Sequence, residues 1–253
     1  MRLPVLALLA AAGLAASPAA AQQQPAPPPT PLPQAEVERM VREYLLREPE
    51  VVYQALQELQ RRQEVEQVET RRRLVAEHRA TIFQAKDDPV GGNPQGDVTI
   101  VEFFDYHCGY CRNMAQGLNG LIGHDPKLRF VFKEMPILSA ESATAAKAAL
   151  ASARQGKYAE FHFALMQAKE LDTASIMGLA AKTGLDARRL AADMEDPAIT
   201  AKLEENLRLA QTLGIDGTPS FVIGDQVVAG AAEIARLAEL IGAERQKAAS
   251  RAN

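Results

Sequence analysis

The stretch Val98-Thr-Ile-Val-Glu-Phe-Phe-Asp-Tyr-His-Cys-Gly-Tyr-Cys-Arg112 decides how this sequence folds. Residues 98–104 are mostly β-branched or aromatic, which is typical of a buried central strand. The residues that follow, from Cys111 to Ile122, predict a helix. Cys108 therefore falls at a strand-to-helix junction, where free N–H groups and the positive end of the helix dipole stabilise a thiolate. We expect Cys108 to be the exposed attacking thiol and Cys111, one turn further on, to be the resolving thiol.

The chain contains no other cysteines, and this pair is only three positions apart. A disulfide between them closes almost no loop and adds little stability, so the pair is chemical rather than structural. A zinc site is disfavoured because no second C-x-x-C or H-x-x-H pair supplies the remaining ligands. A Cu(I) site formed by the two thiolates and His107 stays chemically open, since thiolates favour that ion. We predict that the chain needs no metal and no cofactor, and that a charged His107 helps to stabilise the Cys108 thiolate.

Glu102 is an acidic residue inside the otherwise apolar strand. In a parallel sheet its carboxyl lies in the core beneath the cysteine pair, and a buried carboxyl is costly unless it is used. We interpret Glu102 as the group that accepts and returns the proton of Cys111. The alternative is that Glu102 faces solvent from an edge strand.

The remaining elements of the domain, residues 87–245, predict its topology. A second strand is expected at 128–132, a hairpin at 220–223 and 226–229 that turns at Gly224-Asp225, and a closing helix at 231–241. Between these parts, residues 138–213 are rich in alanine and carry helix caps and stops, which indicates an all-helical insertion. This order predicts an α/β, thioredoxin-like fold with an inserted all-helical subdomain.

The tetrapeptide Gly217-Thr-Pro-Ser220 immediately precedes the predicted hairpin. Proline is tolerated at the start of a strand. A cis peptide bond before Pro219 would expose backbone groups of Thr218, so that an extended substrate could pair with them. We predict that Gly109, Tyr110 and His107, next to the cysteines, also contact the substrate.

The N-terminal third of the chain has a different composition. Residues 1–21 read as a secretion signal cleaved after Ala21, with an uncleaved membrane anchor as the alternative, and residues 22–33 form a proline-rich leader. Residues 34–86 are expected to form a helical oligomerisation segment and arm. Its apolar positions have helical spacing before a polar helix at 60–73. The alternative is that residues 37–59 fold back onto the domain. The net charge of -4 disfavours nucleic-acid binding.

The motif from Val101 to Arg112, followed by Lys133 and by Gly217-Thr-Pro-Ser-Phe221, resembles bacterial periplasmic DsbA-like proteins. The resemblance covers roughly residues 88–241. It implies a thioredoxin fold with an inserted helical subdomain, a nucleophilic Cys108, a resolving Cys111, Glu102 as a buried acid near Lys133, and a cis Pro219.

Within that family, the dipeptide Gly109-Tyr110 and the residue Thr218 look like DsbC-type disulfide isomerases rather than DsbA-type oxidases. Residues 37–59 are similar to the N-terminal region of the trimeric suppressor-of-copper-sensitivity C group. The resemblance implies a homotrimeric periplasmic isomerase or reductase that acts on disulfides of exported proteins and is kept reduced by a membrane dithiol donor. A dithiol oxidase and a copper-binding thiol chaperone remain as alternatives.

Overall fold

The computed structural model describes residues 32–252, which form two compact units divided between Gln57 and Glu58. The predicted signal peptide and most of the proline-rich leader lie outside the described residues. Helix α1 spans Gln34–Arg47, and the expected break follows at Glu48-Pro49. The next helix, α2, runs from Glu50 to Glu77. The sequence predicted two shorter helices here, and the structure joins them into one because no glycine or proline interrupts this stretch.

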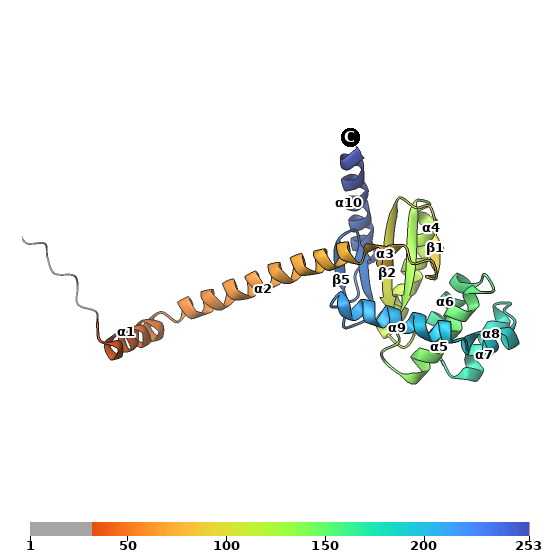
Figure 1. The fold of residues 1–253 in the computed structure, drawn as a ribbon, viewed down its shortest axis with the longest axis horizontal. Coiled ribbons are helices and arrows are strands. Elements are labelled where there is room, and N and C mark those ends of the chain that lie inside the picture. Colours follow the sequence, from red (N-terminus) through yellow and green to blue (C-terminus); the bar gives the residue numbers. More distant parts are fainter. Residues whose placement is uncertain (1–31, 253) are drawn as a thin grey trace, which may run out of the picture. The chain divides into compact units, whose positions relative to one another are not determined.

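The second unit is built on a five-stranded mixed sheet of order β1-β3-β2-β4-β5 (Figure 1). Its strands are β1 (Val90–Gly92), β2 (Val98–Phe104), β3 (Leu128–Glu134), β4 (Ser220–Ile223) and β5 (Gln226–Ala229). Strands β2 and β3 are parallel, and the other three pairings are antiparallel. Strand β2 is therefore internal, which rules out the edge position that would have exposed Glu102 to solvent.

Helices cover both faces of this sheet. They are α3 (Arg79–Phe83), α4 (Gly109–His124), α5 (Ala140–Ala153), α6 (Tyr158–Gln167), α7 (Thr173–Lys182), α8 (Ala187–Met194), α9 (Pro197–Thr212) and α10 (Ile234–Ala252). Helices α5 to α9 form the predicted all-helical insertion, and Figure 1 shows α5 to α8 gathered beside the strands. The fold is thioredoxin-like with an inserted helical subdomain, as the sequence predicted.

Two hydrophobic clusters, one on each face, define which way each strand residue points. Ile100 and Phe104 of β2 pack with α4, α10 and the insertion, whereas Val101 and Phe103 pack with α3 and the end of α9. Side chains alternate along a strand, so Glu102 points to the face that α4 covers. Gly117 allows α4 to approach α10 closely, since a Cβ there would lie 2.6 Å from Ile234.

The same alternation sends Lys133 to the face opposite Glu102. Glu102 is in register with Phe132, and Lys133 is in register with Phe103. The fully buried Lys133 ammonium forms an ion pair with Asp88 (2.5 Å) and donates to the carbonyl of Thr81 (2.9 Å). Lys202 of α9 binds the other oxygen of Asp88 at 2.6 Å. The expectation that Glu102 lies near Lys133 is therefore wrong: the lysine balances a carboxylate on the other side of the sheet.

Candidate redox site

The cysteine pair lies at the N-terminus of α4. Cys108 is the N-cap residue, and its sulfur accepts a hydrogen bond from the backbone N–H of Cys111 at 3.4 Å. Both cysteines are free thiols. Residues 105–108 place the pair because the Cys108 N–H donates to the carbonyl of Asp105 at 3.1 Å, which closes a tight turn between β2 and α4. The strand-to-helix junction that the sequence predicted is present.

Access to Cys108 is narrower than the sequence suggested. Its exposed fraction is 5%, and that of Cys111 is 0%. The peptide bond between Thr218 and Pro219 is cis, and the Cys108 thiol donates to the Thr218 carbonyl at 3.2 Å. The prediction of an exposed Cys108 is therefore corrected, because the loop before β4 covers much of the sulfur. The Thr218 carbonyl thus lies directly against the thiol that the sequence predicts to be the nucleophile.

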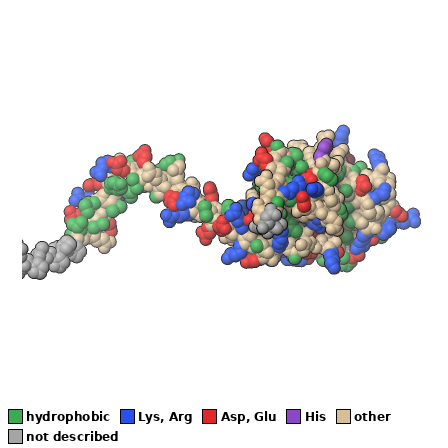
Figure 2. All heavy atoms as spheres, turned by 90° about the horizontal axis from the view of Figure 1, so that it is seen from above, with side chains coloured by type: hydrophobic (Ala, Val, Ile, Leu, Met, Phe, Trp, Pro, Cys, Tyr) green, Lys and Arg blue, Asp and Glu red, His purple; other side chains and the backbone are tan. Residues whose placement is uncertain are grey.

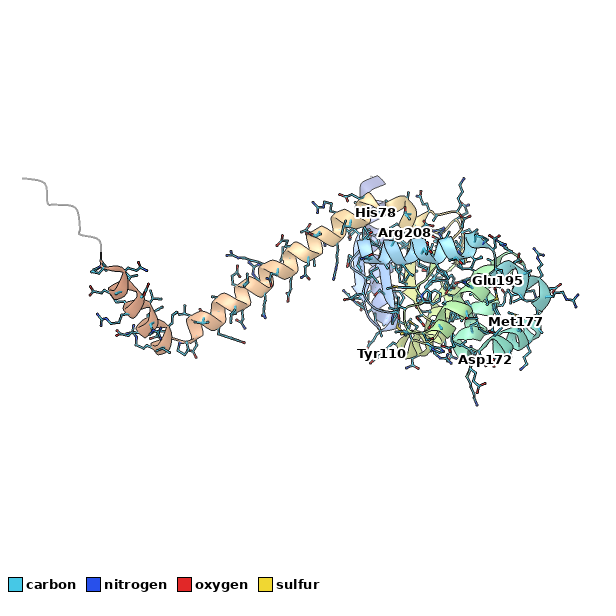
Figure 3. All side chains as sticks on the ribbon, turned by 60° about the horizontal axis from the view of Figure 1, so that its bottom comes forward. His78, Tyr110, Asp172, Met177, Glu195 and Arg208 are labelled. Atoms are coloured by element: carbon cyan, nitrogen blue, oxygen red, sulfur yellow. The ribbon has the colours of Figure 1, made fainter. Side chains whose placement is uncertain are left out.

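The other predicted contact residues surround the opening. Gly109 is exposed, and a Cβ atom at this position would have no neighbouring atom within 4 Å. Lack of space therefore does not require glycine there. Tyr110 is 68% exposed and lies at the edge of the domain in Figure 3. The exposed His107 shares a 3.0 Å hydrogen bond between its Nδ1 and the hydroxyl of Ser139. The structure therefore brings Gly109, Tyr110, His107 and Thr218 together around Cys108.

Asp105 organises this opening and was not singled out from the sequence. One oxygen of its buried carboxylate accepts from the His107 N–H (2.7 Å) and the Ser142 hydroxyl (2.6 Å). The other accepts from the N–H groups of Ile137 (2.8 Å) and Leu138 (3.0 Å). The side chains of Ile137 and Leu138 are themselves exposed, at 41% and 54%. Asp105 thus fixes an apolar loop next to the cysteine pair, and its place directly after a strand was the only sequence signal for it.

Glu102 is buried on the face that α4 covers, with an exposed fraction of 1%. Burial raises the pKa of its carboxyl to about 8, and a negative charge on Cys108 adds to the effect. One of its oxygens, Oε1, has no hydrogen-bond partner among the described residues. Burial, and after it the charge of Glu102, also raises the pKa of the Cys111 thiol. A carboxyl that is half ionised at a pH of about 8, beside a thiol that resists ionisation, is suited to proton exchange with that thiol.

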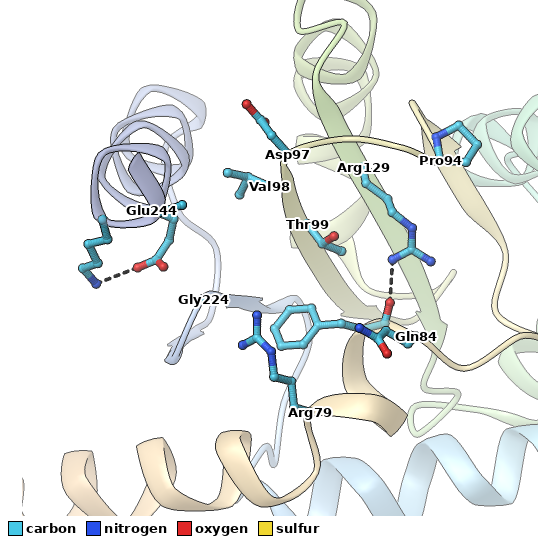
Figure 4. Close-up of a pocket in the computed structure, with 12 residues that line it drawn as sticks. Arg79, Gln84, Pro94, Asp97, Val98, Thr99, Arg129, Gly224 and Glu244 are labelled. Carbon is cyan, nitrogen blue, oxygen red and sulfur yellow. Dashed lines mark hydrogen bonds and ion pairs between the residues drawn. The ribbon is translucent and has the colours of Figure 1, made fainter. Parts of the chain in front are cut away.

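A hollow at the other end of β2 is separate from this site. It is lined by residues that include Arg79, Val98, Arg129 and Glu244, and it has a volume of about 460 Å³ (Figure 4). Val98 begins the strand whose opposite end leads to Cys108. Neither cysteine lines this hollow.

Groups of three or more residues able to hold a metal ion are absent from residues 32–252. Within the same range, the helices include none with the length and apolar character needed to cross a bilayer. Figure 2 shows basic and acidic side chains interspersed over the visible face of the second unit. That face therefore offers no continuous basic surface of the kind that binds nucleic acid.

A thioredoxin-like sheet, a Cys-x-x-Cys pair at a helix N-terminus and a facing cis-proline loop define a thiol-disulfide oxidoreductase. Residues 99–242 match the family model of the DSBA-like thioredoxin domain, and residues 34–66 match that of the copper resistance protein ScsC N-terminal domain. The chain belongs to the DsbA-like thioredoxin family.

Two solved structures illustrate the similarity. A thioredoxin-like oxidoreductase from Silicibacter pomeroyi is 44% identical, with a TM-score of 0.65, over 66% of this chain and 98% of that one. Proteus mirabilis ScsC in a transitional conformation is 27% identical, with a TM-score of 0.65, over 85% of this chain and 97% of that one. The second match covers a larger share of this chain than the first.

Among curated proteins, the chain is similar to the Na(+)/H(+) antiporter NhaA of Herminiimonas arsenicoxydans. The two are 28% identical over 161 residues, which is 63% of this chain and 26% of that relative. The chain thus spans about a quarter of the curated relative that it matches.

The raised pKa of Glu102 predicts a pH dependence of stability. The folded state holds this proton more tightly than the unfolded state, so the stabilisation is complete below the unfolded pKa of about 4.5 and is lost as the pH rises towards about 8. Each unit of pKa difference corresponds to about 1.4 kcal/mol. Urea unfolding of the reduced protein from pH 5 to 9 should show a free energy of unfolding that falls with pH, and Glu102→Gln should flatten that fall. Parallel curves for the two proteins would show that Glu102 is not buried as an acid.

Proposed function

We propose that this chain is a periplasmic disulfide isomerase and reductase of exported proteins, working as a homotrimer. The main support for the proposal is the exposed apolar face of α1, because the same chain also contains the redox site. Val37, Met40, Val41, Tyr44 and Leu45 are each between 36% and 51% exposed, and α1 buries none of its residues. Figure 2 shows hydrophobic side chains gathered over this helix.

These residues recur at offsets of three and four, so they share one stripe of the helix. A stripe of this kind is stable in water when it packs against copies of itself. The match of residues 34–66 to the ScsC N-terminal domain supports self-association. The resemblance of residues 37–59 to the trimeric suppressor-of-copper-sensitivity C group supports three copies. Several redox sites in one assembly can hold a misfolded client at more than one point, which raises the effective concentration for reshuffling its disulfides.

The reaction begins when the Cys108 thiolate attacks one sulfur of a client disulfide. A bond forms between Cys108 and that sulfur, the client disulfide breaks, and the other client sulfur leaves as a thiolate. In isomerisation, a client thiolate then attacks the mixed disulfide and restores the Cys108 thiolate, with no net transfer of electrons. In reduction, Cys111 gives its proton to Glu102 and attacks Cys108. A bond between Cys108 and Cys111 forms, and the client leaves reduced.

The surroundings of Cys108 support a protein substrate. Beside it, Tyr110, Ile137 and Leu138 are exposed apolar side chains. The Thr218 carbonyl now accepts from the Cys108 thiol, and it becomes free to pair with an extended client once that thiol forms the mixed disulfide. An unfolded client presents both apolar side chains and unpaired backbone. The isomerase must be kept reduced, so a membrane dithiol donor is the proposed partner that renews the cysteine pair.

The roles of the two cysteines are separable by substitution. Cys108→Ser should abolish reduction of insulin disulfides, because no nucleophile remains at the helix terminus. Cys111→Ser should retain attack but accumulate a mixed disulfide at Cys108, because the resolving thiol is gone. Non-reducing electrophoresis and mass spectrometry identify the adduct. Turnover by Cys108→Ser at the rate of the unsubstituted protein would contradict the assignment.

The assembly is tested by a substitution on the apolar stripe of α1. Val41→Glu should convert the trimer to a monomer, because a charge in each copy would be buried at the interface. Light scattering gives the mass. The monomer should keep its reduction of insulin and lose reactivation of scrambled ribonuclease.

The matched control is Arg42→Glu, which places a glutamate at the adjacent polar position and should remain trimeric and active. A monomeric Val41→Glu variant that still reactivates scrambled ribonuclease would contradict the proposed link between assembly and isomerisation. Monomeric behaviour of the unsubstituted protein would contradict the trimer itself.

A further inference from the structure

A second buried carboxyl lies on the same face of the sheet as Glu102. Glu134 ends β3, where it is in register with Phe104, and Glu102 is in register with Phe132. The two glutamates are therefore diagonal neighbours on adjacent strands, and alternation points both toward the face that α4 covers. Glu134 has an exposed fraction of 0%. The mechanism above does not use this group.

Two tyrosines hold Glu134 in place. The hydroxyl of Tyr158 on α6 donates to its Oε1 at 2.6 Å, and the hydroxyl of Tyr106 donates to the same oxygen at 3.1 Å. Tyr106 is also 3.0 Å from Nδ1 of His162. Burial lowers the pKa of His162 to about 3, so its ring is neutral. The tautomer with a proton on Nδ1 donates to Tyr106 and leaves the tyrosine proton for Glu134.

Each of the two glutamates leaves one buried oxygen without a hydrogen-bond partner in the described part of the chain, Oε1 of Glu102 and Oε2 of Glu134. An ionised carboxylate normally collects several donors when it is buried. Glu134 accepts two hydrogen bonds, both at Oε1, and its Oε2 accepts none. The Oε1 atom of Glu102 also has no donor in the described part of the chain. This sparse solvation favours a neutral acid over a carboxylate at Glu134.

The charged and titratable groups around Glu134 add to this preference. Its pKa lies well above its ordinary value, first because of burial and then because of the negative charges of Asp105 and Glu102, while the two tyrosines act in the opposite direction. The ammonium of Lys133 is on the other face of the sheet. On α4, the guanidinium of Arg112 donates to the carbonyls of Tyr106 and Ala168. Two carboxylates in one apolar core repel each other strongly, so one of them keeps its proton.

We propose that Glu134 is a positioning residue for the redox pair: it is the second member of a coupled pair of acids and keeps its proton while Glu102 exchanges its own with Cys111. The proton balance is simple. Cys111 loses a proton to the Glu102 carboxylate and becomes a thiolate, and the Glu134 carboxylic acid is unchanged. Because Glu134 stays neutral, it adds no negative charge that would oppose ionisation of Glu102. This inference rests on the proposed role of Glu102.

Coupling must be reciprocal, and this gives a test by infrared spectroscopy of the full mature protein. The C=O stretch of a carboxylic acid reports protonation directly. At neutral pH, Glu102→Gln should retain a band from protonated Glu134, and the double variant Glu102→Gln with Glu134→Gln should lose it. Without the charge of Glu102, the Glu134 band should also titrate at a lower pH than in the unsubstituted protein. The expected difference is about one pH unit, which is a change of about tenfold in proton affinity.

Two further variants secure the assignment. Tyr158→Phe keeps the carboxyl and removes its shortest hydrogen bond, so the band should change frequency without disappearing. Glu160→Gln, an exposed glutamate on the same helix α6, should leave the band unaltered. A purely structural role for Glu134 would affect stability and not the titration of Glu102.

Absence of the band in the Glu102→Gln variant at neutral pH would overturn the proposal. A Glu134 titration that is identical with and without the Glu102 carboxylate would overturn it too. These outcomes are independent of whether Glu102 accelerates turnover. A failure of the catalytic role of Glu102 would appear as unchanged kinetics of its Gln variant, and the infrared bands would still report the pairing.

Discussion

The structure depends on the burial of a carboxyl without a cation beneath the two thiols. Glu102 lies in an internal strand, against a helix whose N-terminus carries Cys108 and Cys111, and no lysine or arginine among the described residues forms an ion pair with it. Its pKa of about 8 follows from that placement. A solvent-exposed glutamate would be ionised throughout the physiological range, and a glutamate paired with lysine would be held ionised. Burial without a counter-charge leaves the group able to take and return a proton.

The sheet separates two electrostatic environments by strand alternation alone. One face holds Glu102, Glu134 and the tyrosine-histidine cluster, and the other holds Lys133, Asp88 and Lys202 as a compact ion-pair network. Both lysines pair with Asp88 on the far face of the sheet, so they do not neutralise the redox face. A buried ion pair costs little net free energy when its partners are well placed, whereas loss of one partner is expensive. The ion-pair network therefore lies on the face of the sheet opposite the redox site, where the loss of any one partner would destabilise the fold.

Several elements could be predicted from sequence because they depend on local pattern. The β-branched run before Cys108 gave the central strand, and the hairpin bounds 220–223 and 226–229 agree with the structure. The helix caps within residues 138–213 gave the insertion. Strand β1 was missed because Val90–Gly92 has three residues and two glycines, which carry no strand signal. The exposure of Cys108 was misjudged because the covering loop is more than 100 residues away in sequence.

The position of Lys133 shows what family resemblance alone does not predict. Its predicted proximity to Glu102 rested on family resemblance. The register between β2 and β3 places the two side chains on opposite faces of the sheet. The importance of Glu134 could have been inferred by the rule that identified Glu102, since both are acids in apolar strands. Its partners Tyr106 and Tyr158 could not, because they lie 28 and 24 residues from Glu134 in sequence and meet it only in the tertiary fold.

The central claim is that Glu102 exchanges a proton with Cys111 when the mixed disulfide is resolved. The most direct test forms that disulfide at Cys108 with a peptide thiol and follows its release by Cys111 in a single turnover from pH 5 to 10. The account predicts a rate that rises with an apparent pKa near 8 and that falls at least about 100-fold in Glu102→Gln, the lower range for general acid-base catalysis. Equal rates and coincident pH profiles for the two proteins would contradict it.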